Sequence, residues 1–211
     1  MLLTRRSFMG LAASALVMIA SQATMAKSIA LSPEQTEAIN RISGYFNSFR
    51  TLKGEFTQIS PKGNMSTGTM YISKPGKMRF DYAAANPFLL GSDGKWVTLK
   101  DRARERGDQV PLSATPLRIV VAPEVDLLRD TNVLGIEQAD GISQVVLEDK
   151  KGSVSGRIML VFDDNRNELQ QWVIIDGKGR RTTVTLSNLE PDVKIDPKLF
   201  VVKINRKEKT R

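Results

Sequence analysis

The sequence predicts a mainly β protein of the α+β class, built on a strongly curved antiparallel sheet or a barrel. Three observations support this prediction. One amphipathic helix pattern lies near the N-terminus, hydrophobic alternation with a period of two recurs in nine later segments, and turn residues separate most of those segments. A single apolar stretch in the middle of the chain interrupts the strand pattern and predicts short helices.

Residues 1–26 are predicted to be a cleaved secretion signal. The motif Thr4-Arg5-Arg6-Ser7-Phe8 precedes an apolar run, Leu11 to Ala20, that is too short to span a bilayer. The small residues of Ala23-Thr24-Met25-Ala26 suit cleavage before Lys27. The arginine pair also matches the twin-arginine export pattern, so both export routes stay open. We therefore expect an exported, soluble mature chain.

The mature chain, 27–211, is expected to form a single domain, because its length suits one hydrophobic core. The sequence contains no cysteine, which excludes disulfides and a lipid-modified cysteine. The full chain has a net charge of +8, and this positive charge favours approach to anionic lipid surfaces or acidic partners. No interleaved aromatic platform or recognition helix accompanies this charge, so we expect no nucleic-acid partner.

The first element after the leader is predicted to be a helix from about Pro33 to Asn47. Ser32 is a suitable N-cap, proline occupies the first helical position, and Gln35 completes a capping box. Apolar residues then recur at spacings of three and four, which gives the helix one apolar face.

Strands follow on both sides of the central apolar stretch. The first set of expected strands is Gly54 to Ser60, Gly68 to Ser73, Lys77 to Tyr82 and Trp96 to Leu99, and the second is Val133 to Gln138, Gln144 to Asp149, Arg157 to Phe162, Leu169 to Ile175 and Thr182 to Leu189. Within the third strand, Met78, Phe80 and Tyr82 share one face and charged residues share the other. This alternation predicts a sheet with one wet side.

The region Arg102 to Asp130 breaks the strand pattern. Its first part is charged and contains glycine, so we expect a loop there. A short apolar helix or lid should begin after Thr115-Pro116, and Pro123 should end it. Leu127 and Leu128 then predict a further short helix.

The chain lacks several of the residue types that are most common in active sites and metal sites. It contains no histidine and no cysteine, and Asp163-Asp164 is interpreted as a turn. We therefore expect neither an enzyme nor a metal site, and no cofactor. Binding by shape and apolar surface is the remaining expectation.

Five segments in order resemble the LolA family of periplasmic carriers of outer-membrane lipoproteins. These segments are Phe49-Arg50-Thr51-Leu52-Lys53-Gly54-Glu55-Phe56-Thr57-Gln58, Gly68-Thr69-Met70-Tyr71-Ile72-Ser73-Lys74-Pro75-Gly76-Lys77-Met78-Arg79-Phe80, Ser92-Asp93-Gly94-Lys95, Thr115-Pro116-Leu117 and Ile195-Asp196-Pro197-Lys198-Leu199-Phe200. Together they span nearly the whole mature chain.

The resemblance implies an unclosed antiparallel β-barrel with helices forming a lid over an apolar cavity for lipoprotein acyl chains. It also implies a monomer in the periplasm and three partners: acylated lipoproteins, an inner-membrane lipoprotein-releasing ABC transporter and an outer-membrane acceptor. The cavity-lining candidates are Met70, Ile72, Met78, Phe80 and Tyr82, and the candidates for the inner side of the lid are Leu117, Val120 and Val121. Plain core packing is the alternative for each of these residues.

Lys74 departs from the family pattern, in which arginine stands before this proline and bonds to lid carbonyls. Lysine keeps the charge but lacks the planar guanidinium fork. Lys74 is therefore a lid-closing candidate, and either the lid is held more loosely here or another group shares the task. A solvated lysine beside a turn is the alternative.

Two other functions remain open at this point. The same architecture could carry free lipids or glycolipids, or it could serve as a lipoprotein-sensing regulatory module. Such sensors usually have an additional domain, and we expect none in a mature chain of this length.

Overall fold

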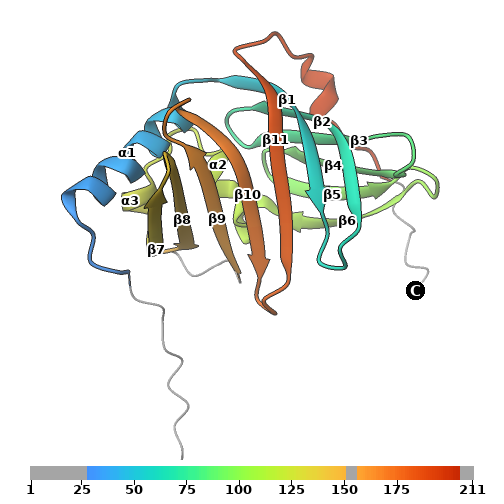
Figure 1. Cartoon of the computed structure of the whole chain (residues 1–211). Coiled ribbons are helices and arrows are strands. Elements are labelled where there is room, and N and C mark those ends of the chain that lie inside the picture. The colour runs from blue at the N-terminus through green and yellow to red at the C-terminus, as the bar shows by residue number, and fades with distance from the viewer. Residues whose placement is uncertain (1–27, 151–155, 205–211) are drawn as a thin grey trace, which may run out of the picture.

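The computed structural model of the chain describes residues 28–150 and 156–204, so the predicted secretion signal lies outside the described residues. Eleven strands form one antiparallel sheet, and short helices accompany it (Figure 1). The elements in chain order are α1 (Pro33–Asn47), β1 (Thr51–Ile59), β2 (Met65–Ser73), β3 (Lys77–Tyr82), β4 (Phe88–Asp93), β5 (Trp96–Asp101), β6 (Arg106–Pro111), η1 (Leu112–Ala114), α2 (Leu117–Val120), α3 (Leu127–Asp130), β7 (Thr131–Ala139), β8 (Ile142–Asp149), β9 (Gly156–Asp163), β10 (Glu168–Asp176), β11 (Arg181–Pro191) and η2 (Pro197–Phe200).

The sheet consists of two meanders joined through one non-sequential pair. Its spatial order is β6-β5-β4-β3-β2-β1-β11-β10-β9-β8-β7, so the first and last strands of the chain lie side by side at its centre. In that central pair, Phe56 of β1 lies opposite Leu186 of β11. Strands β6 and β7 are the two edges of the sheet among the described residues and do not pair with each other, so the sheet is not closed into a barrel. The predicted mainly β, unclosed antiparallel architecture is confirmed.

Two strands differ from the prediction. β6 occupies residues that were expected to form a loop, because an edge strand that pairs only with β5 has mostly exposed, polar side chains and no hydrophobic alternation. β4 was missed because it ends in Gly91-Ser92-Asp93, a sequence typical of a turn. Asp93 does shape the following turn, since its carboxylate accepts hydrogen bonds from the amides of Lys95 and Trp96.

Helix α1 has the predicted bounds and the predicted cap. The Ser32 hydroxyl accepts from the Gln35 amide at 3.2 Å, and the Gln35 side chain accepts from the Ser32 amide at 3.0 Å. Its apolar face, which includes Ile39, Ile42 and Phe46, is buried, and the helix packs against α3 and β10. Helix α1 is thereby fixed to the second meander.

Removing the cap should lower the stability of the whole domain. Ser32→Ala is expected to reduce the free energy of unfolding by about 1 kcal/mol, because one amide at the helix start loses its acceptor. Urea unfolding followed by circular dichroism measures this change. Ser28→Ala, whose hydroxyl lies 3.4 Å from the Asn132 side chain near the surface, is the matched control and should change stability little. Equal losses for both variants would contradict the role of the cap.

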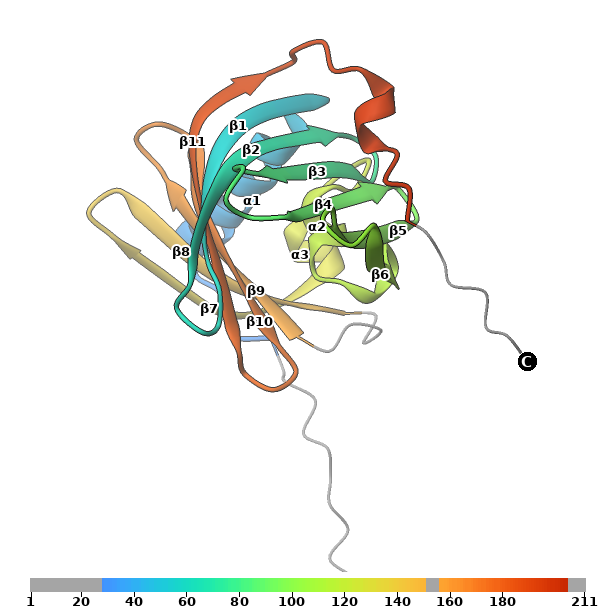
Figure 2. The same cartoon turned by 90° about the vertical axis from the view of Figure 1, so that its right-hand side faces the viewer.

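The hydrophobic core fills the concave side of the sheet. Helices α2 and α3 lie inside the curve of the strands, as Figure 2 shows. Buried residues from α1, α2, α3 and the concave faces of both meanders form one continuous cluster. Within the described ranges, no helix is long and apolar enough to cross a membrane.

Candidate functional site

A small apolar cavity lies between helix α2 and the concave face of the sheet. Its volume is about 150 Å³. Strands β1, β3, β4, β10 and β11 and the first residue of α2 provide its wall, which consists of Gln58, Phe80, Tyr82, Leu90, Leu117, Trp172, Ile174, Thr182 and Val184. A cavity of this size holds a molecule as small as benzene, so a longer apolar ligand requires the wall to move.

The predicted site residues divide into two groups. Phe80, Tyr82 and Leu117 line the cavity itself. The other five pack in the hydrophobic cluster around the cavity, and the exposed fraction of each is at most 3 %. These five residues are Met70, Ile72, Met78, Val120 and Val121. The structure thus brings the five cavity-lining candidates and the three lid candidates together on one side of the sheet, and three of these eight residues lie at the cavity wall.

An aromatic cluster forms much of the wall and was only partly predicted. The Phe80 ring lies 5.0 Å from the Phe56 ring and 6.0 Å from the Trp172 ring, both in edge-to-face geometry. The Tyr82 ring contacts Phe56 at 5.2 Å. Trp172 reaches Phe80 because β10 and β3 curve toward each other across the concave side, a proximity that hydrophobic alternation within each strand does not show. Edge-to-face packing of this kind stabilises the wall while leaving apolar ring surface for a ligand.

Few polar side chains line the cavity, and two of them bind each other. The Tyr82 hydroxyl donates to the Gln58 side chain at 2.9 Å. Burial raises the pKa of Tyr82 above its ordinary value, so the ring stays neutral at physiological pH. The wall therefore offers apolar contacts rather than charge.

Helix α2 is fastened to the sheet by an ion pair and a backbone bond. The Arg118 guanidinium binds the Asp149 carboxylate at the end of β8 through two hydrogen bonds, one of them 3.0 Å from Nε to Oδ2. The Asp149 side chain is 1 % exposed. In addition, the Gly76 amide in the β2–β3 turn donates to the Val121 carbonyl at 2.8 Å. These two contacts hold the helix over the cavity, and we refer to α2 as the lid helix.

Lys74 precedes the turn that contacts the end of the lid helix, but its side chain bonds to α1. Its ammonium donates to the Phe46 carbonyl in the last turn of α1 and lies 4.8 Å from the centre of the Phe49 ring. Burial, followed by the nearby positive charge of Arg50, lowers the pKa of Lys74 to about 8. The Lys74 side chain therefore joins α1 to the start of the β2–β3 turn. The Gly76 amide of the same turn binds the Val121 carbonyl at the end of the lid helix.

The lowered pKa of Lys74 predicts how stability depends on pH. Between about 8 and the ordinary value of 10.5, the unfolded chain binds this proton more strongly than the folded chain does. Stability contributed by this group should therefore rise with pH across that window. Urea unfolding from about pH 8 to about pH 10 should show a rising component that Lys74→Met lacks. Parallel pH profiles for the two proteins would contradict the prediction.

The acidic pair Asp163-Asp164 forms a turn, as predicted. The Asp163 carboxylate accepts from the amides of Asn165 and Arg166 at 3.0 Å each, and Asp164 binds Arg41 and Ser143. In the part of the chain that the structure describes, no group of three or more acidic side chains could hold a metal ion.

Sequence comparison matches most of the chain to one family. Residues 47–203 match the family model described as "Outer membrane lipoprotein carrier protein LolA". A protein of Azotobacter vinelandii named outer-membrane lipoprotein carrier protein is 28 % identical, with 85 % of this chain and 91 % of that protein covered. A protein of the same name from Dechloromonas aromatica is 27 % identical, with coverage of 72 % and 77 %.

Solved structures of similar shape share little sequence with this chain. The LolA superfamily protein NE2245 from Nitrosomonas europaea has a TM-score of 0.46 and 9 % identity, over 79 % of this chain and 97 % of that chain. An uncharacterized conserved protein from Thermus thermophilus has a TM-score of 0.49 and 10 % identity, over 82 % and 99 % of the two chains.

Proposed function

The chain belongs to the LolA family of outer-membrane lipoprotein carrier proteins, and from this premise we propose that it carries lipoproteins through the periplasm. It binds their acyl chains when they leave the inner membrane and delivers them to the outer membrane. The observation that carries the proposal is the apolar cavity beneath the lid helix, walled by Phe80, Tyr82, Trp172 and Leu117.

The physical need for such a carrier follows from the hydrophobic effect. Each buried CH₂ group contributes about 0.8 kcal/mol, so exposing one acyl chain of about fifteen methylenes to water costs on the order of 12 kcal/mol. Free diffusion of a triacylated lipoprotein is then negligible. A protein cavity that covers the chains lowers this cost without any covalent chemistry, and we infer that the protein is a carrier and not an enzyme.

Loading requires the lid helix to move. The cavity of about 150 Å³ is far smaller than the roughly 300–1,000 Å³ of sites that hold drug-sized ligands. The lid helix is a short segment, held by the Arg118–Asp149 pair, by the Gly76–Val121 bond and by the packing of its buried apolar side chains. Its displacement breaks two polar contacts and uncovers apolar surface, which acyl chains would then cover. Acyl chains would replace the core contacts of Leu117 and open a continuous space between the lid helix and the strands.

Direction of transport must come from partners. We infer an inner-membrane lipoprotein-releasing ABC transporter that uses energy to load the cavity, and an outer-membrane acceptor that binds the acyl chains more tightly. Both partners are inferred from the family, and the protein itself supplies only reversible binding.

One release experiment tests the carrier function against its alternatives. The purified protein is incubated with spheroplasts that retain newly made lipoproteins, and the soluble fraction is assayed for lipoproteins bound to it. Lipoproteins in a complex with the protein support the proposal. Recovery of free phospholipid or glycolipid alone, identified by mass spectrometry, contradicts it in favour of a general lipid carrier. Binding without release from the membrane contradicts it in favour of a lipoprotein sensor.

A further inference from the structure

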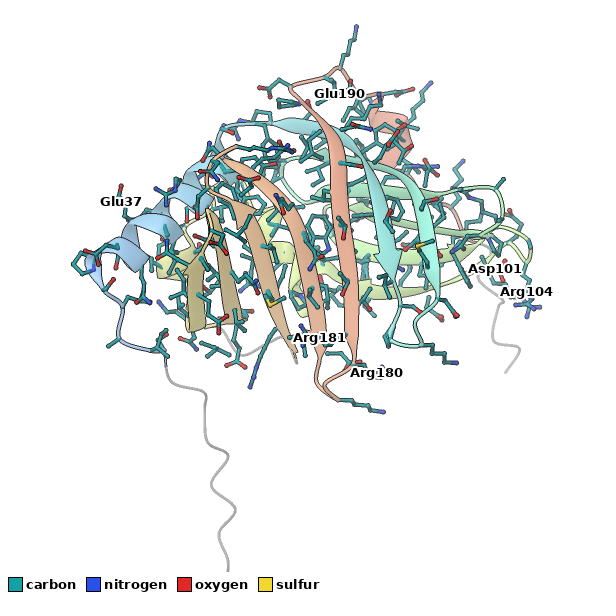
Figure 3. All side chains as sticks on the ribbon, viewed as in Figure 1. Glu37, Asp101, Arg104, Arg180, Arg181 and Glu190 are labelled. Atoms are coloured by element: carbon teal, nitrogen blue, oxygen red, sulfur yellow. The ribbon has the colours of Figure 1, made fainter. Side chains whose placement is uncertain are left out.

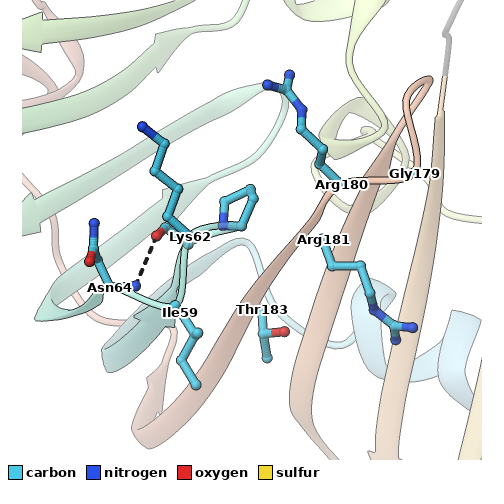
Figure 4. A pocket seen from close by; sticks show the side chains of 10 residues that line it. Ile59, Lys62, Asn64, Gly179, Arg180, Arg181 and Thr183 are labelled. Carbon is cyan, nitrogen blue, oxygen red and sulfur yellow. Dashed lines mark hydrogen bonds between the residues drawn. The ribbon is translucent and has the colours of Figure 1, made fainter.

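An open groove of about 840 Å³ lies between two hairpin turns at one end of the sheet. The β1–β2 turn, residues 60–64, forms one side, and the β10–β11 turn, residues 177–180, forms the other (Figure 4). The two turns are neighbours because β1 pairs with β11 at the centre of the sheet. We call this region the hairpin groove.

The hairpin groove is strongly basic. The two turns and their flanking residues carry four cationic side chains, Lys62, Lys178, Arg180 and Arg181, against the single carboxylate of Asp176. Arg180 pairs with Asp176 at 2.7 Å, whereas neither Lys62 nor Arg181 forms an ion pair with any described residue. Arg180 and Arg181 project from this end of the molecule, as Figure 3 shows. The uncompensated charge favours an anionic partner.

An exposed apolar pair lies beside these charges. Ile59 and Met65 are cross-strand partners at the last pair of residues before the β1–β2 turn. Their side chains are unusually exposed for large apolar groups, at 45 % and 71 %. Apolar side chains flanked by lysine and arginine are typical of surfaces that enter the interface of a bilayer. A bilayer accepts such side chains without the shape complementarity that a protein partner must provide.

The hairpin groove is directly next to the cavity. Gln58 and Thr182 line the cavity on the concave face, whereas their neighbours Ile59, Arg181 and Thr183 line the groove. Alternation along a strand places adjacent residues on opposite faces of the sheet. The same ends of β1 and β11 thus separate the apolar cavity from the basic groove.

We propose that the hairpin groove docks the protein on bilayers that contain anionic phospholipid. The cations bind headgroup phosphates, and Ile59 and Met65 enter the interface between headgroups and acyl chains. The cavity end of the sheet then lies against the bilayer, where acyl chains enter or leave. This docking goes beyond the carrier function, because it needs neither a lipoprotein nor a protein partner.

Vesicle flotation tests the docking with lipid alone. The purified protein is mixed with phosphatidylcholine vesicles that contain or lack phosphatidylglycerol, at low and at physiological salt. Binding is expected only when phosphatidylglycerol is present, and it should weaken with salt. The double variant Lys62→Glu, Arg181→Glu should bind at least tenfold more weakly, because each basic residue near an anionic surface contributes severalfold to affinity.

The matched control is Lys194→Glu, Lys198→Glu, which changes the net charge equally. Both lysines are exposed and lie in the segment after β11 that includes η2, at the end of the molecule opposite the hairpin turns (Figure 1). This variant should keep most of the binding. Equal losses in the two double variants would show a net-charge effect and overturn the proposal.

Two further results separate membrane docking from attraction to an acidic protein surface. Met65→Ser should reduce binding to phosphatidylglycerol vesicles without any change in charge, and unchanged binding would overturn the insertion of the apolar pair. If the protein floats with neither kind of vesicle, membrane docking is overturned and the same charges remain available to an acidic protein surface. The lipoprotein-release assay is scored separately, so a failure of docking is distinct from a failure of the carrier function.

Discussion

Leu117→Glu is expected to abolish the release of lipoproteins from spheroplast membranes while the protein still folds and is exported. Leu117 is the first residue of the lid helix and lines the cavity opposite strand residues such as Phe80 and Trp172. Its side chain is only partly buried, so a carboxylate can reach water when the lid is open. Closure over acyl chains would bury that charge without a partner, at a cost of several kcal/mol.

A matched variant separates a cavity effect from a general effect of added charge. Val110→Glu adds the same charge on edge strand β6, where the side chain is 47 % exposed, and should release lipoproteins normally. Phe80→Glu should also abolish release, but Phe80 is 5 % exposed, so circular dichroism must first show that this variant is folded. Normal release by a folded Leu117→Glu protein would contradict the assignment of the cavity as the acyl-chain site.

Arg118→Ala is expected to lower the free energy of unfolding by about 3 kcal/mol and to loosen the lid helix. The substitution leaves the buried Asp149 carboxylate without its guanidinium, and breaking a buried pair from one side is strongly destabilising. Arg118→Lys should lose part of this energy, because an ammonium cannot form both hydrogen bonds at once. Urea unfolding measures the stability, and hydrogen exchange of the Val121 amide, which bonds to the Leu117 carbonyl, measures lid opening.

A double-mutant cycle identifies the source of the effect. Asp149→Ala should also lower the free energy of unfolding, and the remaining guanidinium, which is 22 % exposed, can then be hydrated. The double variant should be less destabilised than the sum of the two single variants. Additive losses, or unchanged exchange at Val121 in Arg118→Ala, would contradict the role of this pair as the lid fastening.

Local sequence patterns predicted much of the fold because most elements carry their own signals. The capping box and the apolar spacing located α1 to the residue, and Pro116 and Pro123 located the lid helix and the break after it. β4 and β6 carried no such signal, since one ends in turn residues and the other is an exposed edge. The pairing of β1 with β11 depends on contacts between distant parts of the chain, which alternation within a strand does not reveal.

The candidate site was predictable only where the family resemblance pointed to it. That resemblance is confirmed by the family match, and it led to Phe80, Tyr82 and Leu117 at the cavity wall. Trp172 was missed because its approach to Phe80 depends on the curvature of the sheet. Lys74 was the predicted lid-closing residue because it stands where the family has an arginine, but its ammonium bonds to the Phe46 carbonyl of α1. The guanidinium that fastens the lid helix is on the helix itself, at Arg118, and it binds Asp149 of β8.

The open seam between β6 and β7 has a consequence for the range of cargo. In a closed barrel, every strand is bonded on both sides, so the lumen has a fixed girth unless backbone hydrogen bonds break. Here the seam lies between two strands that are not bonded to each other, and helices α2 and α3 lie inside the curve of the sheet. The sheet can flatten or curl by small changes of twist between neighbouring strands, so the girth can follow the ligand. Under the proposed carrier function, one protein could therefore hold acyl chains of different number and length with every ladder hydrogen bond intact.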